Sequence, residues 1–156
     1  MSEDKKLKQG TASTSVVGML RQGWIGVACW MAVGLLLEGL LGYKAPGYLN
    51  DAQRRELFRL AHTHGTLLSA VLILAALTGA RFGGPFGSAR LAQVCLRIGS
   101  VMMPLGFLLA GVWHPEGDPG LAIWIVPPGA LLMIFGVVAM ALSLKGSRQD
   151  SQDGTG

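Results

Sequence analysis

Four apolar stretches, each about 20 residues or longer, separate the charged residues of this chain into clusters. The clusters occupy residues 1–21, 44–59, 81–97 and 145–153. An α-helix rises 1.5 Å per residue, so roughly 20 apolar residues cross the hydrocarbon core of a bilayer. The layout therefore predicts an all-α polytopic membrane protein, a four-transmembrane-helix bundle.

The composition agrees with a membrane protein. Of the 156 residues, 51% are hydrophobic and 14% are charged, whereas soluble domains carry roughly 25% charged residues. The net charge of +4 comes from Lys and Arg that flank the apolar stretches. No basic stripe with interleaved aromatic residues is present, which argues against a nucleic-acid partner and leaves the lipid bilayer as the partner.

Three segments follow from this pattern. Residues 1–15 are polar and rich in Lys, Ser and Thr, and residues 1–20 are predicted to be a disordered cytoplasmic N-terminus. Residues 21–145 form the four-helix transmembrane domain, with helices expected at about 22–42, 51–80, 91–113 and 121–144. Residues 146–156 predict a disordered cytoplasmic tail.

Prolines and polar residues mark the helix ends. Asn50 is expected to cap the second helix, with Gln53 at its third position. Pro104 falls inside the third helix and predicts a kink. Pro127 and Pro128 fall in the second turn of the fourth span. Either that helix kinks there, or it begins at the prolines and LAIWIV precedes it as a buried irregular segment.

The distribution of Lys and Arg predicts the orientation. With both termini in the cytoplasm, nine basic residues lie inside and four outside, which the positive-inside rule favours. The inner set is Lys5, Lys6, Lys8, Arg21, Arg81, Arg90, Arg97, Lys145 and Arg148, and the outer set is Lys44, Arg54, Arg55 and Arg59. We expect a multi-pass protein of the bacterial inner membrane.

This orientation gathers the candidate site residues on the outer side. Glu38 lies near the outer end of the first helix, His62 and His64 open the second membrane span, and His114 ends the third. A carboxylate on a membrane helix is costly and is a functional-site hypothesis by default. A bundle that brought these side chains together would form a cofactor-binding site for haem or a transition metal.

The two neighbouring histidines cannot serve one ion from one helix. Residues two apart in an α-helix point roughly 200° apart. The face of His62 continues through small and hydroxyl residues, which indicates contact with another helix. The face of His64 continues through leucines and predicts packing among aliphatic side chains.

Three functional hypotheses remain open. The first is an accessory or structural module of a larger membrane complex or of a homo-oligomer, because small residues are abundant and no nucleophile motif or phosphate loop is present. The second is a haem- or metal-binding protein that uses Glu38, His62 or His64, and His114. The third is a small proton-coupled or solute carrier with Glu38 as the titrating group. We expect no catalytic centre.

Two short motifs resemble a known family. The second helix contains His64-Gly65-Thr66-Leu67-Leu68, and the last helix places Pro127, Gly129, Ala130 and Gly136 around an apolar run. In these features residues 22–145 resemble the YgdD-like family of small four-helix integral membrane proteins of unknown function. The resemblance implies a fold and a membrane location, and it makes His64 the counterpart of the family histidine. It implies no activity.

Overall fold

The computed structural model describes residues 2–82, 90–115 and 117–149, and the described residues form helices and connecting turns without strands. In chain order, the elements are α1 (Ser2–Gly42), α2 (Pro46–Leu49), α3 (Ala52–Phe82), α4 (Arg90–Val112), the 3₁₀ helix η2 (Leu121–Ile125) and α5 (Val126–Gln149). The predicted all-α fold class is confirmed.

Four of these helices are long and apolar enough to span a membrane. The spans are Ser15–Gly42, Ala52–Arg81, Arg90–Val112 and Leu121–Ser143. Each contains at least 23 residues, or roughly 34 Å of helix, against a hydrocarbon core of about 30 Å. The predicted multi-pass membrane architecture agrees with these spans.

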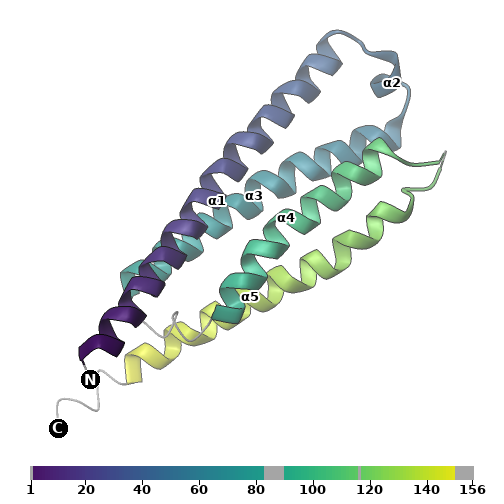
Figure 1. Ribbon diagram of the computed structural model, residues 1–156. Helices are drawn as coiled ribbons and strands as arrows, with labels where there is room; N and C mark the ends of the chain where they lie inside the picture. Colours follow the sequence, from purple (N-terminus) through teal and green to yellow (C-terminus); the bar gives the residue numbers. More distant parts are fainter. Residues whose placement is uncertain (1, 83–89, 116, 150–156) are drawn as a thin grey trace.

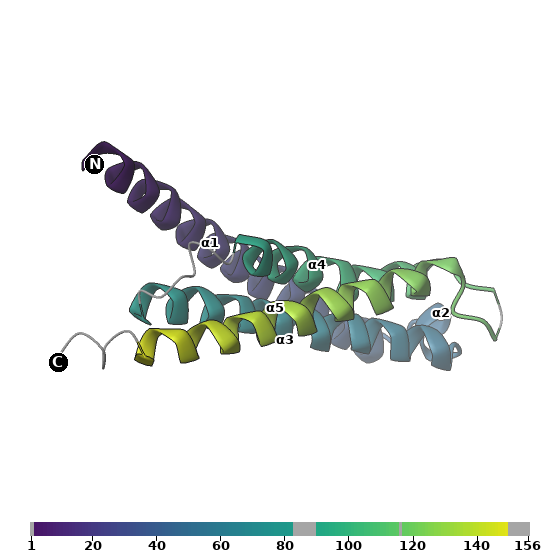
Figure 2. The same ribbon diagram turned by 90° about the horizontal axis from the view of Figure 1, so that it is seen from below.

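The four long helices pack in series rather than as a closed ring. α1 packs on α3, α3 packs on α4, and α4 packs on α5, while α1 and α4 touch only lightly. Figure 1 shows α3 between α1 and α4, and Figure 2 shows α1 and α4 in one layer with α3 and α5 in the other. α1 and α5 are therefore the two edges of the assembly.

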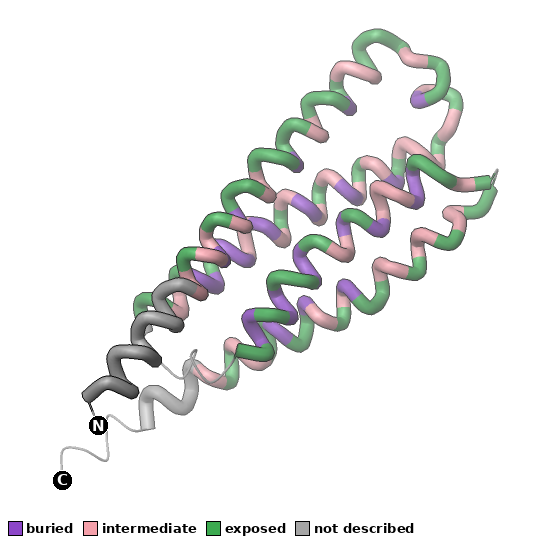
Figure 3. The backbone as a smooth tube through the Cα atoms, in the orientation of Figure 1, coloured by how far each residue is buried: buried purple, intermediate pink, exposed green. Residues whose placement is uncertain are grey.

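Burial follows this order. In the apolar windows of α1 and α5 only 17% of residues are buried inside the chain, against 39% in α3 and 50% in α4. Figure 3 shows the buried positions concentrated where α3 and α4 face their neighbours. One cluster of buried side chains draws on all four helices: Met19, Leu72, Ala75, Ala76, Leu96 and Met133.

The bundle has two distinct ends (Figure 1). The terminal end contains the start of α1, the end of α3, the start of α4 and the end of α5. The loop end contains α2 and residues 113–120. The structure thus places the first and last helical residues, Ser2 and Gln149, at the same end.

The first segment differs from the sequence prediction. Residues 1–20 were expected to be disordered, yet α1 begins at Ser2 and continues without a break into the membrane span. A helix is costly to nucleate but cheap to extend, and this segment contains no proline. The membrane span supplies the nucleus from which the polar residues extend the helix. Of the tail, residues 150–156 lie outside the described part.

The predicted cap at Asn50 is wrong by one residue. Asp51 Oδ1 accepts a hydrogen bond of 2.8 Å from the backbone N–H of Arg54 and so caps α3. Asn50 has helical dihedral angles (φ −81°, ψ −9°) and donates its N–H to Pro46, because it ends α2. A residue that ends one helix in this conformation cannot adopt the extended backbone that a cap requires.

The start of the last helix resolves the two alternatives. α5 begins at Val126, so the prolines occupy its first turn, and LAIWI forms the 3₁₀ helix η2 before it. The first backbone N–H groups of a helix have no partner within it, so a proline there forfeits no hydrogen bond. The second alternative is correct in where the helix begins, but the preceding segment is a 3₁₀ helix and none of its residues is buried, so the predicted buried irregular segment is wrong.

Candidate functional site

His62 faces α1, as its sequence stripe predicted. Its Nδ1 lies 2.7 Å from the carbonyl oxygen of Trp30. The ring fits into a notch at Gly34, where an added Cβ would lie 2.5 Å from His62 Cε1. A carbonyl oxygen only accepts, so Nδ1 must donate, and Nε2 of the neutral ring is left as an acceptor. This contact joins the first half of α3 to α1.

His64 faces the opposite neighbour, α4. Its Nδ1 donates to the carbonyl oxygen of Leu60 one turn earlier, over 2.9 Å. Its ring packs against that of Phe107, with centroids 5.2 Å apart and planes tilted by 32°. The predicted aliphatic environment therefore includes an aromatic partner. The two histidines diverge by the angle that the helical repeat requires.

His114 belongs to a polar cluster at the loop end. Its side chain is only 4% exposed, and its Nε2 lies 3.2 Å from Oδ2 of Asp51. This separation is that of an ion pair when the ring is protonated, although the geometry is not that of a regular hydrogen bond. His114 Nδ1 lies 3.0 Å from the carbonyl oxygen of Pro115, to which it donates.

Arg54 completes this cluster. Its Nε donates to the carbonyl oxygen of Gly111 at the end of α4, and its Nη1 donates to that of Gly47 in α2, both over 3.1 Å. The backbone N–H of Arg54 lowers the pKa of the Asp51 carboxyl below its ordinary value of 3.8, and the charges of His114 and Arg54 act in the same direction against partial desolvation. The cluster ties three helices together at the loop end.

Glu38 stands apart from the histidines. It is exposed on α1 and, within the described part of the chain, has no hydrogen-bond or ion-pair partner. It precedes the end of α1 at Gly42 by about 6 Å. The carboxylate thus lies close to one edge of the hydrocarbon core rather than at its centre.

The four predicted site residues occupy separate environments. His62 contacts α1, His64 contacts α4, His114 pairs with Asp51, and Glu38 faces outward. All three histidines donate through Nδ1 to a backbone carbonyl, the orientation common in metal-ligating histidines. Among residues 2–82, 90–115 and 117–149, however, no three His, Cys, Asp or Glu side chains converge on a point that could hold a metal ion.

A groove of about 600 Å³ lies between α1 and α4, with Ser69 and Leu72 of α3 at its floor. We call it the α1–α4 groove. It exists because the serial packing separates α1 from α4. Sequence reasoning missed it, since Arg21 and Arg97 were counted only as topology signals. The sequence feature that could have indicated the groove is Arg97, because a charged residue well inside an apolar helix is rare without a specific role.

Comparisons with known proteins add no neighbour to this picture. No family model, no curated protein and no solved structure matches this chain.

Proposed function

We propose that this chain is an accessory or structural module of a larger membrane complex, and that it associates through one exposed face of α1. This face, here called the α1 seam, has members spaced alternately four and three residues apart. They are Trp24, Ala28, Met31, Leu35, Glu38 and Gly42, all exposed. This spacing keeps one stripe of a helix against a partner helix along its whole length.

The unpartnered carboxylate of Glu38 is the observation that supports the seam. Acidic side chains on membrane helices almost always pair with another polar group. The described residues offer Glu38 no such group. The fitting partner is a membrane helix with a hydrogen-bond donor or a basic side chain near the same bilayer edge.

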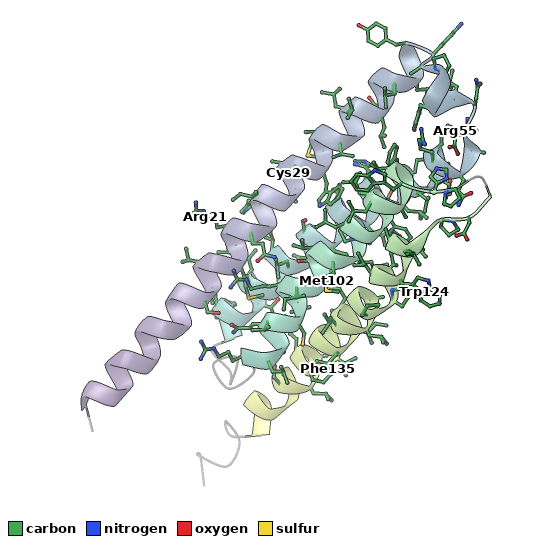
Figure 4. The ribbon with its side chains drawn as sticks, turned by 45° about the vertical axis from the view of Figure 1, so that its right-hand side comes forward. Arg21, Cys29, Arg55, Met102, Trp124 and Phe135 are labelled. Carbon is green, nitrogen blue, oxygen red and sulfur yellow. The ribbon has the colours of Figure 1, made fainter. Side chains whose placement is uncertain are left out.

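The exposed face of α5 provides a useful contrast. Between Val126 and Ser143, where its side chains are described, the large exposed residues are apolar, and they include Leu131, Ile134, Phe135, Val138 and Leu142. Figure 4 shows Phe135 and Trp124 projecting away from the bundle. An apolar surface of this kind is as stable in contact with lipid tails as it is in contact with another helix. α1 and α5 are both edge helices, but of these two faces, as far as the structure describes their side chains, the α1 seam alone contains a charged group that lipid leaves unpaired.

The same proposal includes a location. We place the protein in the bacterial inner membrane, with both termini and therefore the terminal end in the cytoplasm. The excess of Lys and Arg at that end supports this orientation. At the loop end, Tyr43, Trp113 and Trp124 are exposed, as expected of aromatic anchors in a membrane interface.

Photo-crosslinking from the seam tests the proposal. In the full chain with Cys29→Ser and Cys95→Ser, a photoreactive maleimide is attached at Met31→Cys on the seam or at Ile134→Cys on α5 as the control. Illumination of native membranes should give one protein band of defined mass from the seam site and only lipid adducts from the control site.

Adding Glu38→Leu to the seam variant should reduce the band about threefold, since an interhelical polar contact in a membrane is worth a fraction of a kcal/mol to ~1 kcal/mol. Lipid adducts alone from both sites would contradict the proposal. A cross-linked band at twice the mass of this chain would mean that the seam binds a second copy of the chain, in a homo-oligomer, rather than another protein of a larger complex.

A further inference from the structure

The α1–α4 groove lies on the other flank of α1 from the seam and has a polar and an apolar part. Towards the terminal end its walls contain Arg21, Gln22, Arg97 and Ser100. Towards the middle of the membrane the lining is apolar. It comprises Ile25, Cys29, Trp30, Leu72, Val101 and Leu105. Its volume of about 600 Å³ falls within the range of about 300–1,000 Å³ for sites that bind small ligands.

Arg97 is held in place by a reciprocal pair of hydrogen bonds. Its Nε donates to Oε1 of Gln22 over 2.8 Å, and Gln22 Nε2 donates to the Arg97 carbonyl oxygen over 2.8 Å. The bonds fix the guanidinium across the gap between α4 and α1. Its Nη atoms lie against Gly18, within 3.8 and 4.0 Å of where a Cβ would be. Gly18 is one turn nearer the terminal end than Gln22, so the guanidinium points towards that surface.

The two Nη groups of Arg97 have no acceptor among the side chains and backbone groups that the structure describes. Among the described residues, neither Arg97 Nη1 nor Nη2 has a hydrogen-bond or ion-pair partner, and Arg21 has none either. The Arg97 backbone lies about 10 Å from the start of α4, and its side chain reaches back towards the terminal end, as long basic side chains near the ends of membrane helices do. Arg21 is exposed and is among the residues that line the groove, and Figure 4 shows its side chain projecting outward from α1.

We propose that the α1–α4 groove binds one anionic phospholipid. Its phosphate accepts hydrogen bonds from the two free Nη groups of Arg97, with Arg21 adding charge at the rim. One acyl chain then lies along the apolar part, over Trp30 and Leu105. A guanidinium presents parallel N–H groups that match the oxygens of a phosphate, and basic pockets between membrane helices on the cytoplasmic side suit such head groups.

Both the charge and the shape of the groove favour a lipid over a free anion. The polar part opens directly into an apolar channel at membrane depth, where an inorganic ion gains nothing. A zwitterionic lipid supplies the same acyl chain, but its head group also carries a cation that opposes Arg21 and Arg97. The arginines therefore select for net negative charge, while the channel selects for an acyl chain.

Quenching of Trp30 by brominated lipid tests this proposal. The full chain with Trp24→Phe, Trp113→Phe and Trp124→Phe retains Trp30, which lines the groove and is 9% exposed. In nanodiscs, acyl-brominated phosphatidylglycerol should quench Trp30 at about fivefold lower mole fraction than brominated phosphatidylcholine, the preference expected from one arginine near an anionic lipid. Excess inorganic phosphate should leave this preference intact.

Arg97→Gln should bring the two lipids to equal quenching. Arg81→Gln is the matched control, because Arg81 is also an exposed arginine near the terminal end but lies outside the groove. It should retain the preference. Helical circular dichroism and unchanged quenching by brominated phosphatidylcholine establish that Arg97→Gln is folded. Equal quenching in the parent chain, equal loss in both variants, or release by inorganic phosphate would each overturn the proposal.

Discussion

At the scale of single residues, glycines decide where the helices of this protein meet. Gly34 lets the His62 ring lie against α1 and reach the Trp30 carbonyl oxygen. A side chain at that position would occupy the space of the ring. Gly39, one turn later on the same helix, has no atom within 4 Å of its Cβ position. Gly34 and Gly39 therefore provide a test position and a control position on the same helix.

Gly34→Ala should therefore destabilise the protein, by about 1–3 kcal/mol, because the His62 ring must move and give up its hydrogen bond. Gly39→Ala should be neutral or stabilising by up to ~1 kcal/mol, since alanine is the better helix former. Equilibrium unfolding in mixed micelles with a denaturing detergent measures both changes.

The His62→Ala background provides the decisive control for this pair. There the cost of Gly34→Ala should vanish, because the clashing ring is absent. An undiminished cost in the double variant would mean that Gly34 acts through something other than His62.

At the scale of helices, α4 and α5 are in contact through their backbones. A Cβ on Gly129 would lie 2.8 Å from the Met103 backbone nitrogen, and one on Gly99 would lie 2.8 Å from the Gly129 carbonyl oxygen. A side chain such as His62 can rotate away from an intruding methyl group, but a helix backbone can only move as a unit. The interface is thus less tolerant than that between α1 and α3.

Gly129→Ala should accordingly cost at least as much stability as Gly34→Ala, about 1–3 kcal/mol or more, with no rescue by His62→Ala. The same unfolding assay provides the comparison. A neutral Gly129→Ala variant would show that the two helices separate readily, contrary to the close contact observed.

The helices themselves were largely predictable from the sequence, whereas their arrangement was not. Apolar length and proline geometry are local properties, so the spans could be read directly and the prolines limited the start of α5 to two alternatives. In a bilayer, faces towards lipid and towards protein are both apolar, so hydrophobic periodicity does not reveal which face packs where. The serial order of helices, and with it the α1–α4 groove, depends on which glycine meets which side chain.

The same reason explains which features of the candidate site could be predicted from the sequence and which could not. The divergence of His62 and His64 followed from the helical repeat alone. The pairing of His114 with Asp51, and the fixing of Arg97 by Gln22, depend on how neighbouring helices are aligned along their lengths. No local sequence pattern shows how neighbouring helices are aligned, so the sequence alone indicates only a role in membrane topology for Arg97.

At the scale of the whole molecule, the orientation in the membrane governs both proposals, since it decides which leaflet meets the groove. In the Cys29→Ser, Cys95→Ser background, Tyr43→Cys lies at the loop end and Arg81→Cys at the terminal end, and both positions are exposed. A membrane-impermeant maleimide applied to spheroplasts should label Tyr43→Cys and reach Arg81→Cys only after the membrane is opened. The reverse pattern would contradict the proposed orientation.

The serial packing also bears on how the protein is assembled. Every extensive interface joins long helices that are consecutive in the chain, α1 with α3, α3 with α4, and α4 with α5. From α3 onward, each long helix that leaves the ribosome therefore meets the preceding long helix, on which it packs, already in the bilayer. Contacts of this local kind speed folding. They also make the stability of the bundle approximately a sum of the interfaces between neighbouring helices, as in repeat proteins.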